Sequence, residues 1–200
     1  MQRVPVKFGA WIEQGFNLYK ENFRTLVLAS IFVVVLSTVT AGILAGPMLA
    51  GLVVLILELG SGKEPKPEAG RVFKGFDFFI PALLFIVVWG IGTFIVSFIA
   101  GVIPVIGQLA SLFAIYAAQT LLMFGLFLIV DRQMEFWPAS MESIQTVKSN
   151  FWPFFALAVV AGIIGSIGVI AFGIGVVFTI PIQGCILAVA YREVFTSSHV

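Results

Sequence analysis

The chain has 200 residues, of which 60% are hydrophobic and only 10% are charged, and its formal net charge is +1. A soluble domain carries about 25% charged residues, so this composition excludes a water-facing surface and places the chain in a lipid bilayer. The near-neutral charge and the lack of a basic tail exclude nucleic acid as a partner. Cys185 is the only cysteine, which excludes an intramolecular disulfide framework.

Residues 6–23 are expected to form an amphipathic helix at the membrane surface. Charged residues are spread through this part of the chain with no short apolar core before a cleavage site, so we expect no cleavable signal peptide. Apolar side chains recur at helical spacing, at Phe8, Ile12, Phe16, Tyr19 and Phe23.

The first uncharged run, Thr25–Leu57, predicts a membrane hairpin over residues 25–59. As one helix the run would be about 50 Å long, against a hydrocarbon core of about 30 Å. It is therefore too long for one crossing and short for two. We expect a turn at Gly46-Pro47 and a second helix that is short, tilted or re-entrant.

The polar stretch 60–79 joins this hairpin to the next. It lacks the G-x-x-x-x-G-K-[ST] pattern of a phosphate-binding loop. We interpret its first half as a solvated linker and residues 68–77 as a second amphipathic interfacial helix. The apolar positions of that helix are Val72, Phe73, Phe76 and Phe79.

Two further uncharged runs predict two further hairpins, over residues 78–130 and 150–191. The first of them would be about 80 Å long as one helix, more than twice the hydrocarbon core of about 30 Å, so it must fold back on itself. A third amphipathic segment, residues 137–149, precedes the last hairpin, and its apolar positions run through Trp137, Met141, Ile144, Val147 and Phe151. The expected turns lie at Gly101, Pro104 and Gly107 in the second hairpin and at Gly173 and Gly175 in the third.

The placement of charge predicts the topology. All eleven Lys and Arg residues lie outside the three uncharged runs, and basic residues accumulate on the cytoplasmic side of membranes. The predicted fold is an all-α integral membrane protein, a single polytopic domain over residues 1–200, with six transmembrane helices in three hairpins and both termini cytoplasmic. The three amphipathic helices should lie along the cytoplasmic surface and not continue straight out of the membrane.

Two parts of the chain resemble a loose bacterial superfamily. The stretch "GPMLAGLVVLILELGSGKEPKPEAGRVFKGFDFF" is similar to its GP-x-x-x-G … G-K-x-P … F-x-G-F pattern, and "LIVDRQMEFWPASMESIQTVKSNFWPFF" with "GIGVVFTIPIQGCILAVAYREVF" is similar to its C-terminal elements. This superfamily comprises small polytopic membrane proteins of unknown function and the membrane domain of some glycerophosphodiester phosphodiesterases. The resemblance, over residues 8–195, implies a bacterial inner (cytoplasmic) membrane protein and supplies no catalytic residues.

No ionisable residue lies in the middle of a predicted span, where a catalytic or proton-coupled group would be expected. We interpret Glu58 and Asp131, at predicted helix ends, as interfacial residues and not as a proton relay. A lone His199 makes no metal site, and Ser140 and Ser143 have no histidine partner for nucleophilic catalysis. We therefore predict no enzymatic activity and no catalytic, cofactor or metal site.

Among the intramembrane polar residues, Gln119 and Gln183 are the most costly, because each places an uncharged amide in hydrocarbon. Interhelical hydrogen bonds, worth about 0.6–2 kcal/mol each, would satisfy them. A polar pore lining is the alternative.

Basic residues beside aromatic residues suit the headgroup layer. Arg71 and Lys74 are three residues apart and could flank one phosphate of an anionic lipid, with Lys20 or Lys148 from the neighbouring amphipathic segments. These four residues form the candidate lipid-headgroup site. The alternative is ordinary flanking charge that sets the topology.

The sequence favours a non-enzymatic inner-membrane protein that acts as an assembly, scaffold or accessory subunit through its helical surfaces. A channel or transporter, built as a homo-oligomer, is one alternative, and a lipid-binding or lipid-handling protein is another. The expected partners are membrane lipids and either further copies of the chain or another membrane protein.

Cysteine labelling tests the topology. The variants Lys66→Cys, Gln145→Cys and Ser198→Cys should be labelled only after the inner membrane is permeabilised, because these positions are expected in the cytoplasm. Gly107→Cys, at an outer turn, should react from outside. Labelling of position 66 in intact cells would contradict the three-hairpin topology.

Overall fold

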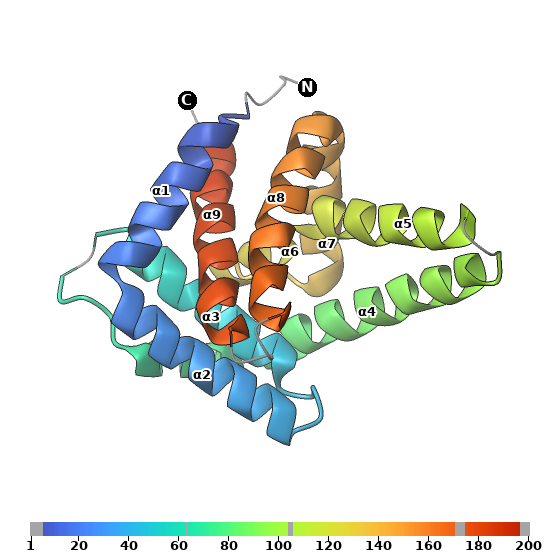
Figure 1. The fold of residues 1–200 in the computed structure, drawn as a ribbon. Helices are drawn as coiled ribbons and strands as arrows, with labels where there is room; N and C mark the ends of the chain where they lie inside the picture. The colour runs from blue at the N-terminus through green and yellow to red at the C-terminus, as the bar shows by residue number, and fades with distance from the viewer. Residues whose placement is uncertain (1–5, 63, 104–105, 171–174, 197–200) are drawn as a thin grey trace.

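The described residues form an all-helical protein. The structure is a computed structural model that describes residues 6–62, 64–103, 106–170 and 175–196, and no strand occurs among them. The all-α fold class predicted from the sequence is therefore confirmed. In chain order the elements are α1 (Phe8–Glu21), α2 (Phe23–Val39), α3 (Ala45–Gly60), the 3₁₀ helix η1 (Ala69–Phe78), α4 (Phe79–Gly101), α5 (Ile106–Leu122), α6 (Gly125–Asp131), α7 (Phe136–Lys148), α8 (Phe151–Ile170) and α9 (Val176–Thr196) (Figure 1).

Several of these helices are long and apolar enough to cross a membrane. Three described segments qualify singly: Ala69–Gly101, Ile106–Asp131 and Val176–Phe195. Two bent pairs, α1 with α2 (89°) and α7 with α8 (110°), raise the number to five if each pair is one span. Helix α3 has 16 residues, which agrees with the short second helix expected in the first hairpin.

Helices occupy all three segments predicted to be amphipathic, as α1, η1 and α7. Helices α1 and α7 turn sharply into the helices that follow them. In contrast, η1 runs into α4 as one segment from Ala69 to Gly101, and at the junction the Phe79 N–H donates to the Phe76 carbonyl. The sharp turn expected of all three segments is therefore absent at η1, because helical hydrogen bonding continues through the junction.

Most of the aromatic side chains predicted to form the apolar faces of these helices are exposed. They are Phe8, Phe16 and Phe23 near α1, Phe73 and Phe76 in η1, and Trp137 in α7. The faces packed against the protein consist of Trp11, Gly15 and Tyr19 in α1, Val72 and Gly75 in η1, and Ala139, Ser140, Ser143 and Val147 in α7. Exposed rings of this kind suit the interfacial layer of a bilayer.

The first turn lies earlier in the chain than the expected Gly46-Pro47. Helix α2 ends at Val39, and the chain reverses where Ala41 has φ 50° and Gly42 has φ 90°. Pro47 lies in the first turn of α3, where the missing N–H of proline costs no hydrogen bond. The Gly-Pro pair therefore opens a helix instead of separating two.

The other two breaks fall at the predicted turns. Helix α4 ends at Gly101, and α9 begins at Val176, directly after Gly175. Pro104 and Gly173, two further predicted turn residues, lie outside the described residues.

Helix α3 and η1 cross with their backbones in direct contact. A Cβ atom at Gly51 would overlap the Val72 carbonyl oxygen, and one at Gly75 would overlap the Pro47 carbonyl oxygen. Gly46 makes a similarly close approach to the backbone of α4. Small residues allow such approaches at helix interfaces in membranes, so the glycines fix how η1 lies on α3.

Helix α9 packs beside α1, α3 and α8 (Figure 1). A Cβ at Gly15 of α1 would lie 2.6 Å from the Ile186 Cα, so the two helices touch through the glycine. Glu193 of α9 also forms an ion pair with Lys7 and accepts a hydrogen bond from the Trp11 indole. These contacts join the first and last of the described helices.

The α4–α5 hairpin projects away from the other helices (Figure 1). In α4 only Ala82 and Phe85 are buried, and both lie near its beginning. The large apolar side chains that the hairpin exposes include Ile91, Phe94, Phe98, Ile99, Ile106, Leu109 and Phe113.

The variant Gly75→Ala should destabilise the fold, because the added Cβ would meet backbone atoms of α3 that cannot move aside. Overpacking of this kind costs about 1–3 kcal/mol, so the melting temperature in detergent should fall. Gly70→Ala is the matched control, since nothing lies within 4 Å of a Cβ at that position of η1. Equal melting temperatures for Gly75→Ala and the wild type would contradict the close crossing.

Candidate functional site: a charged cavity beside η1

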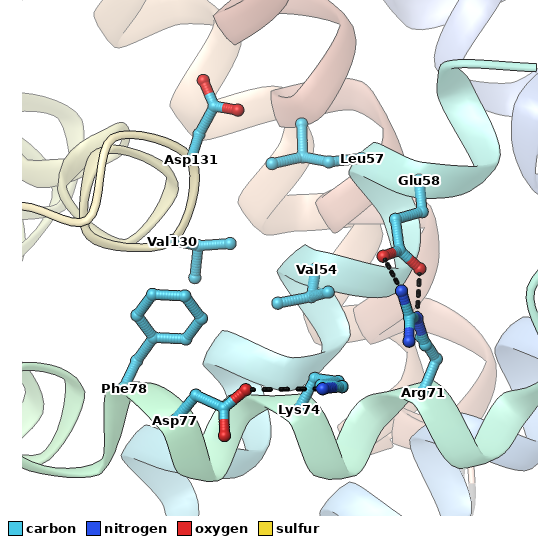
Figure 2. A pocket seen from close by; sticks show the side chains of 9 residues that line it. All are labelled: Val54, Leu57, Glu58, Arg71, Lys74, Asp77, Phe78, Val130 and Asp131. Carbon is cyan, nitrogen blue, oxygen red and sulfur yellow. Dashed lines mark hydrogen bonds and ion pairs between the residues drawn. The ribbon is translucent and has the colours of Figure 1, made fainter. Parts of the chain in front are cut away.

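A cavity of about 290 Å³ lies where α3, η1 and α6 meet. Figure 2 shows charged side chains around its apolar residues Val54 and Val130. The lining residues are Val54, Leu57 and Glu58 of α3, Arg71, Lys74, Asp77 and Phe78 of η1, and Val130 and Asp131 of α6.

The geometry of η1 gathers the charged residues on one face. A 3₁₀ helix has three residues per turn, so residues i and i+3 lie directly above one another. Arg71, Lys74 and Asp77 therefore form one stripe, and all three line the cavity. The next stripe contains Val72 and Gly75, which are buried against α3.

The third stripe of η1 is aromatic. The rings of Phe73 and Phe76 stack with their centres 6.4 Å apart and their planes at 7°. Phe76 stacks in the same way on Phe79, at 6.3 Å and 12°. Residues 71–79 thus present one charged, one packing and one aromatic position per turn.

This three-residue repeat explains why the segment is a 3₁₀ helix. Residues 71–79 read Arg-Val-Phe, Lys-Gly-Phe, Asp-Phe-Phe. In an α-helix of 3.6 residues per turn, each stripe would shift by about 60° per repeat. Three residues per turn keep the glycine on α3 while the charged stripe stays on the cavity.

An ion pair holds the beginning of the charged stripe. The Arg71 Nε and Nη2 atoms each donate to a different carboxylate oxygen of Glu58, both at 2.7 Å. Such two-point contacts between Arg and a carboxylate are among the strongest ion pairs. The pair therefore ties the end of α3 to η1, in addition to the glycine crossing.

The other charged pair on η1 is loose. Lys74 Nζ and Asp77 Oδ2 are 3.8 Å apart, and both side chains are more than half exposed. Exposed pairs of this kind contribute about 0–1 kcal/mol. Lys74 and Asp77 can therefore each leave this pair and bind another partner.

Asp131 is held on the α6 side of the cavity. Its Oδ2 accepts a hydrogen bond of 2.8 Å from the Tyr191 hydroxyl of α9. The neighbouring Arg132 donates to Glu142 of α7 at 2.6 Å and lies 5.1 Å from the centre of the Phe195 ring. The end of α6 is thus tied to both α7 and α9, which holds Asp131 in place.

The structure brings together two of the four basic residues predicted to bind a lipid headgroup. Arg71 and Lys74 both line the cavity. Lys20 lies over the Phe16 ring in α1, 4.5 Å from its centre, and Lys148 is exposed in the last turn of α7. Neither Lys20 nor Lys148 is among the lining residues, and a site built from all four stays a prediction.

The two predicted intramembrane amides have different surroundings. Gln119 is exposed on α5. Gln183 is partly buried on α9 and faces α8, where its Oε1 is 2.8 Å from the position of a Cβ at Gly165. A pore lined by both residues stays a prediction.

Sequence reasoning did not place Glu58, Asp77 and Asp131 in one site. Glu58 and Asp131 come from helices far apart in the sequence, and only the packing of α3, η1 and α6 brings them to the same cavity. The three-residue repeat of residues 71–79 is the pattern that indicates Asp77 as a member of the charged stripe. The α-helical spacing expected for the apolar residues of that segment hides the repeat.

The two serines considered as nucleophiles hold helices together. Ser140 Oγ accepts a hydrogen bond of 2.8 Å from the Trp89 indole and donates to the Phe136 carbonyl at 2.6 Å. Ser143 Oγ donates to the Leu121 carbonyl at 2.7 Å. Within the part of the chain that the structure describes, no group of three His, Cys, Asp or Glu residues could hold a metal ion. The charged cavity is thus the feature best suited to bind a ligand.

No protein-family model, curated protein or solved structure matches this chain. The resemblance to the bacterial superfamily therefore stays a prediction based on short motifs. Functional inference depends on the cavity, the exposed surfaces and the distribution of charge.

The variant Tyr191→Phe should loosen the end of α6, because it removes the hydroxyl that donates to Asp131. A hydrogen bond to a charged group contributes about 1.5–3 kcal/mol, so the melting temperature in detergent should fall. Asp131→Asn is the comparison, since its amide oxygen can still accept from Tyr191 and the loss should be smaller. A larger loss in Asp131→Asn would contradict this hydrogen bond as the main link.

Proposed function

We propose that the chain is a multi-pass protein of the bacterial inner membrane, with six crossings in three hairpins and both termini cytoplasmic. The support comes from the three candidate spans and two bent pairs and from the one-sided placement of Lys and Arg. Helix α3 would supply the shortest crossing. Its 16 residues span about 24 Å, so the bilayer would thin locally to match it.

Within that membrane we propose a non-enzymatic role as an assembly, scaffold or accessory subunit. The observation that carries this role is the projecting α4–α5 hairpin (Figure 1). In the apolar window of Ala69–Gly101 only 11% of the residues are buried, against 44% in Ile106–Asp131. Helix α4 therefore offers most of its surface to a partner helix or to lipid.

Small residues on α4 favour a helix as the partner. A Cβ at Gly90 or at Gly92 would have nothing within 4 Å. Open space above a glycine lets a second helix approach closely, and such approaches stabilise helix pairs in membranes. Phe94 and Phe98, both 70% exposed, follow on the same helix and would supply contact area.

A second candidate function, lipid binding or lipid handling, is favoured by the charged cavity. The cavity lies beside the stacked and exposed Phe73 and Phe76, and aromatic rings concentrate at the level of lipid headgroups. The resemblance to the membrane domain of glycerophosphodiester phosphodiesterases points in the same direction. A channel or transporter stays an alternative for which Gln119 and Gln183 are the candidate polar residues.

Native purification in lipid nanodiscs followed by mass spectrometry tests the scaffold role. The chain should be found in a stoichiometric complex with another membrane protein. The double variant Phe94→Ala, Phe98→Ala should lose that partner, because it truncates exposed rings of the hairpin.

The matched control for this experiment is Phe8→Ala with Phe16→Ala, which truncates exposed rings on α1. This variant should keep the partner. A chain that is purified alone with retained lipid would contradict the scaffold role and favour lipid handling. A homo-oligomer without a partner would contradict it in favour of a channel.

A further inference from the structure

The charged cavity beside η1 has an excess of negative charge. The carboxylates of Glu58, Asp77 and Asp131 line it together with only two cations, Arg71 and Lys74. A cleft with this balance repels a purely anionic group, because the local potential follows the excess charge. A ligand that carries a positive charge of its own therefore suits the cavity better than a purely anionic one.

The ion pair of Arg71 with Glu58 leaves few hydrogen-bonding groups for a ligand at that end of the cavity. Both oxygens of Glu58 accept hydrogen bonds from the guanidinium group at 2.7 Å. The pair is internally neutral, and breaking it would forfeit two charge-assisted hydrogen bonds. The groups that remain for a ligand are Lys74, Asp77 and Asp131.

These three groups can each take a new partner. Lys74 and Asp77 are separated by 3.8 Å, which exceeds the range of about 2.7–3.2 Å for a hydrogen bond. Tyr191 donates to the Oδ2 of Asp131, and a carboxylate can accept at both of its oxygens. The site thus combines one available cation with two available carboxylates.

The size and surroundings of the cavity match a lipid headgroup. Its volume of about 290 Å³ lies near the lower limit of about 300 Å³ for pockets that enclose small molecules. Val54, Phe78 and Val130 supply an apolar lining for a linker. The adjacent aromatic stripe of η1 suits the headgroup layer, so the cavity holds a headgroup while acyl chains stay in the bilayer.

We propose that this cavity binds the zwitterionic headgroup of a phospholipid, in which a primary ammonium is joined to a phosphate by a short carbon linker. Lys74 contacts the phosphate and its neighbour Asp77 accepts hydrogen bonds from the ammonium, while Asp131, on the opposite side of the cavity, adds negative charge that disfavours an anionic head (Figure 2). A primary ammonium has the N–H donors that carboxylates need, whereas a quaternary ammonium is recognised by a cage of aromatic rings. Phe78 is the aromatic residue among those that line the cavity, so an ethanolamine head fits better than a choline head.

This proposal rests on the lipid-binding candidate function, and native mass spectrometry of the detergent-purified chain tests it. The protein is mixed with equal amounts of phosphatidylethanolamine, phosphatidylcholine and phosphatidylglycerol. The wild type should retain phosphatidylethanolamine about tenfold more than either of the others, the effect of one charge-assisted contact. Preference for phosphatidylglycerol would overturn the proposal and support an anionic lipid at Arg71 and Lys74.

The double variant Asp77→Asn, Asp131→Asn should lose this preference and gain retention of phosphatidylglycerol. Among the residues that line the cavity, Lys74 is then the only charged one outside the Arg71–Glu58 pair. The single variant Asp77→Asn changes an exposed side chain and should shift the preference in the same direction. The matched control is Glu13→Gln with Glu21→Gln, which removes two exposed carboxylates from α1. Unchanged retention of phosphatidylethanolamine in the double variant would overturn the proposal.

Soluble glycerophosphoethanolamine distinguishes a lipid from a free headgroup. It should displace the bound lipid only at a concentration at least about a hundredfold higher, because it lacks the acyl chains that add buried apolar area. Equal affinity for the soluble compound would overturn the assignment to a lipid. Membrane fractionation and size-exclusion chromatography of each variant distinguish failure of the proposed membrane function from failure of the headgroup site. A chain missing from the membrane fraction would contradict the membrane function itself. An inserted chain without lipid preference would contradict only the headgroup site.

Discussion

Direct backbone contact between α3 and η1 is the constraint on which most of the other features depend. Because Gly51 and Gly75 leave no space for side chains, a shift of η1 along α3 would bring larger residues into the backbone contact. The observed register brings Arg71 to Glu58 and turns the charged stripe toward α6. It also sets where α4 begins, since η1 runs into α4 without a break. The two glycines thus contribute, with the contacts of α4 to α6 and α7, to the direction in which the hairpin projects.

The three stripes of η1 show how one short helix can serve three environments. An amphipathic α-helix normally has two faces, one apolar and one polar. With three residues per turn, η1 separates the contact with protein from the contact with lipid and leaves a third face for charge. Phe73 and Phe76 are therefore exposed without loss of packing, because Val72 and Gly75 provide the contact with α3.

Composition and charge-free runs were sufficient to predict the helical class, helices over the three segments expected to be amphipathic and two of the three breaks, because hydropathy is a local property of the chain. The prediction of a break at Gly46-Pro47 was wrong, since the same residues can end one helix or open another. The position of the turn depended on the positive φ angles at Ala41 and Gly42. Two of the five charged residues that line the cavity, Arg71 and Lys74, are predicted from the sequence as residues of a ligand site. Glu58 and Asp131 join it only through helix packing, which no local pattern encodes.

The contact of α1 with α9 limits the order in which helix contacts can form during synthesis. Trp11 donates to Glu193, 182 positions further along the sequence. At the ribosomal rate of about 5–20 residues per second, this partner emerges about 10–40 s after Trp11. During that interval α1 lacks the surface on which Gly15 packs. The nascent chain thus carries α1 without its α9 partner until residue 193 has been synthesised.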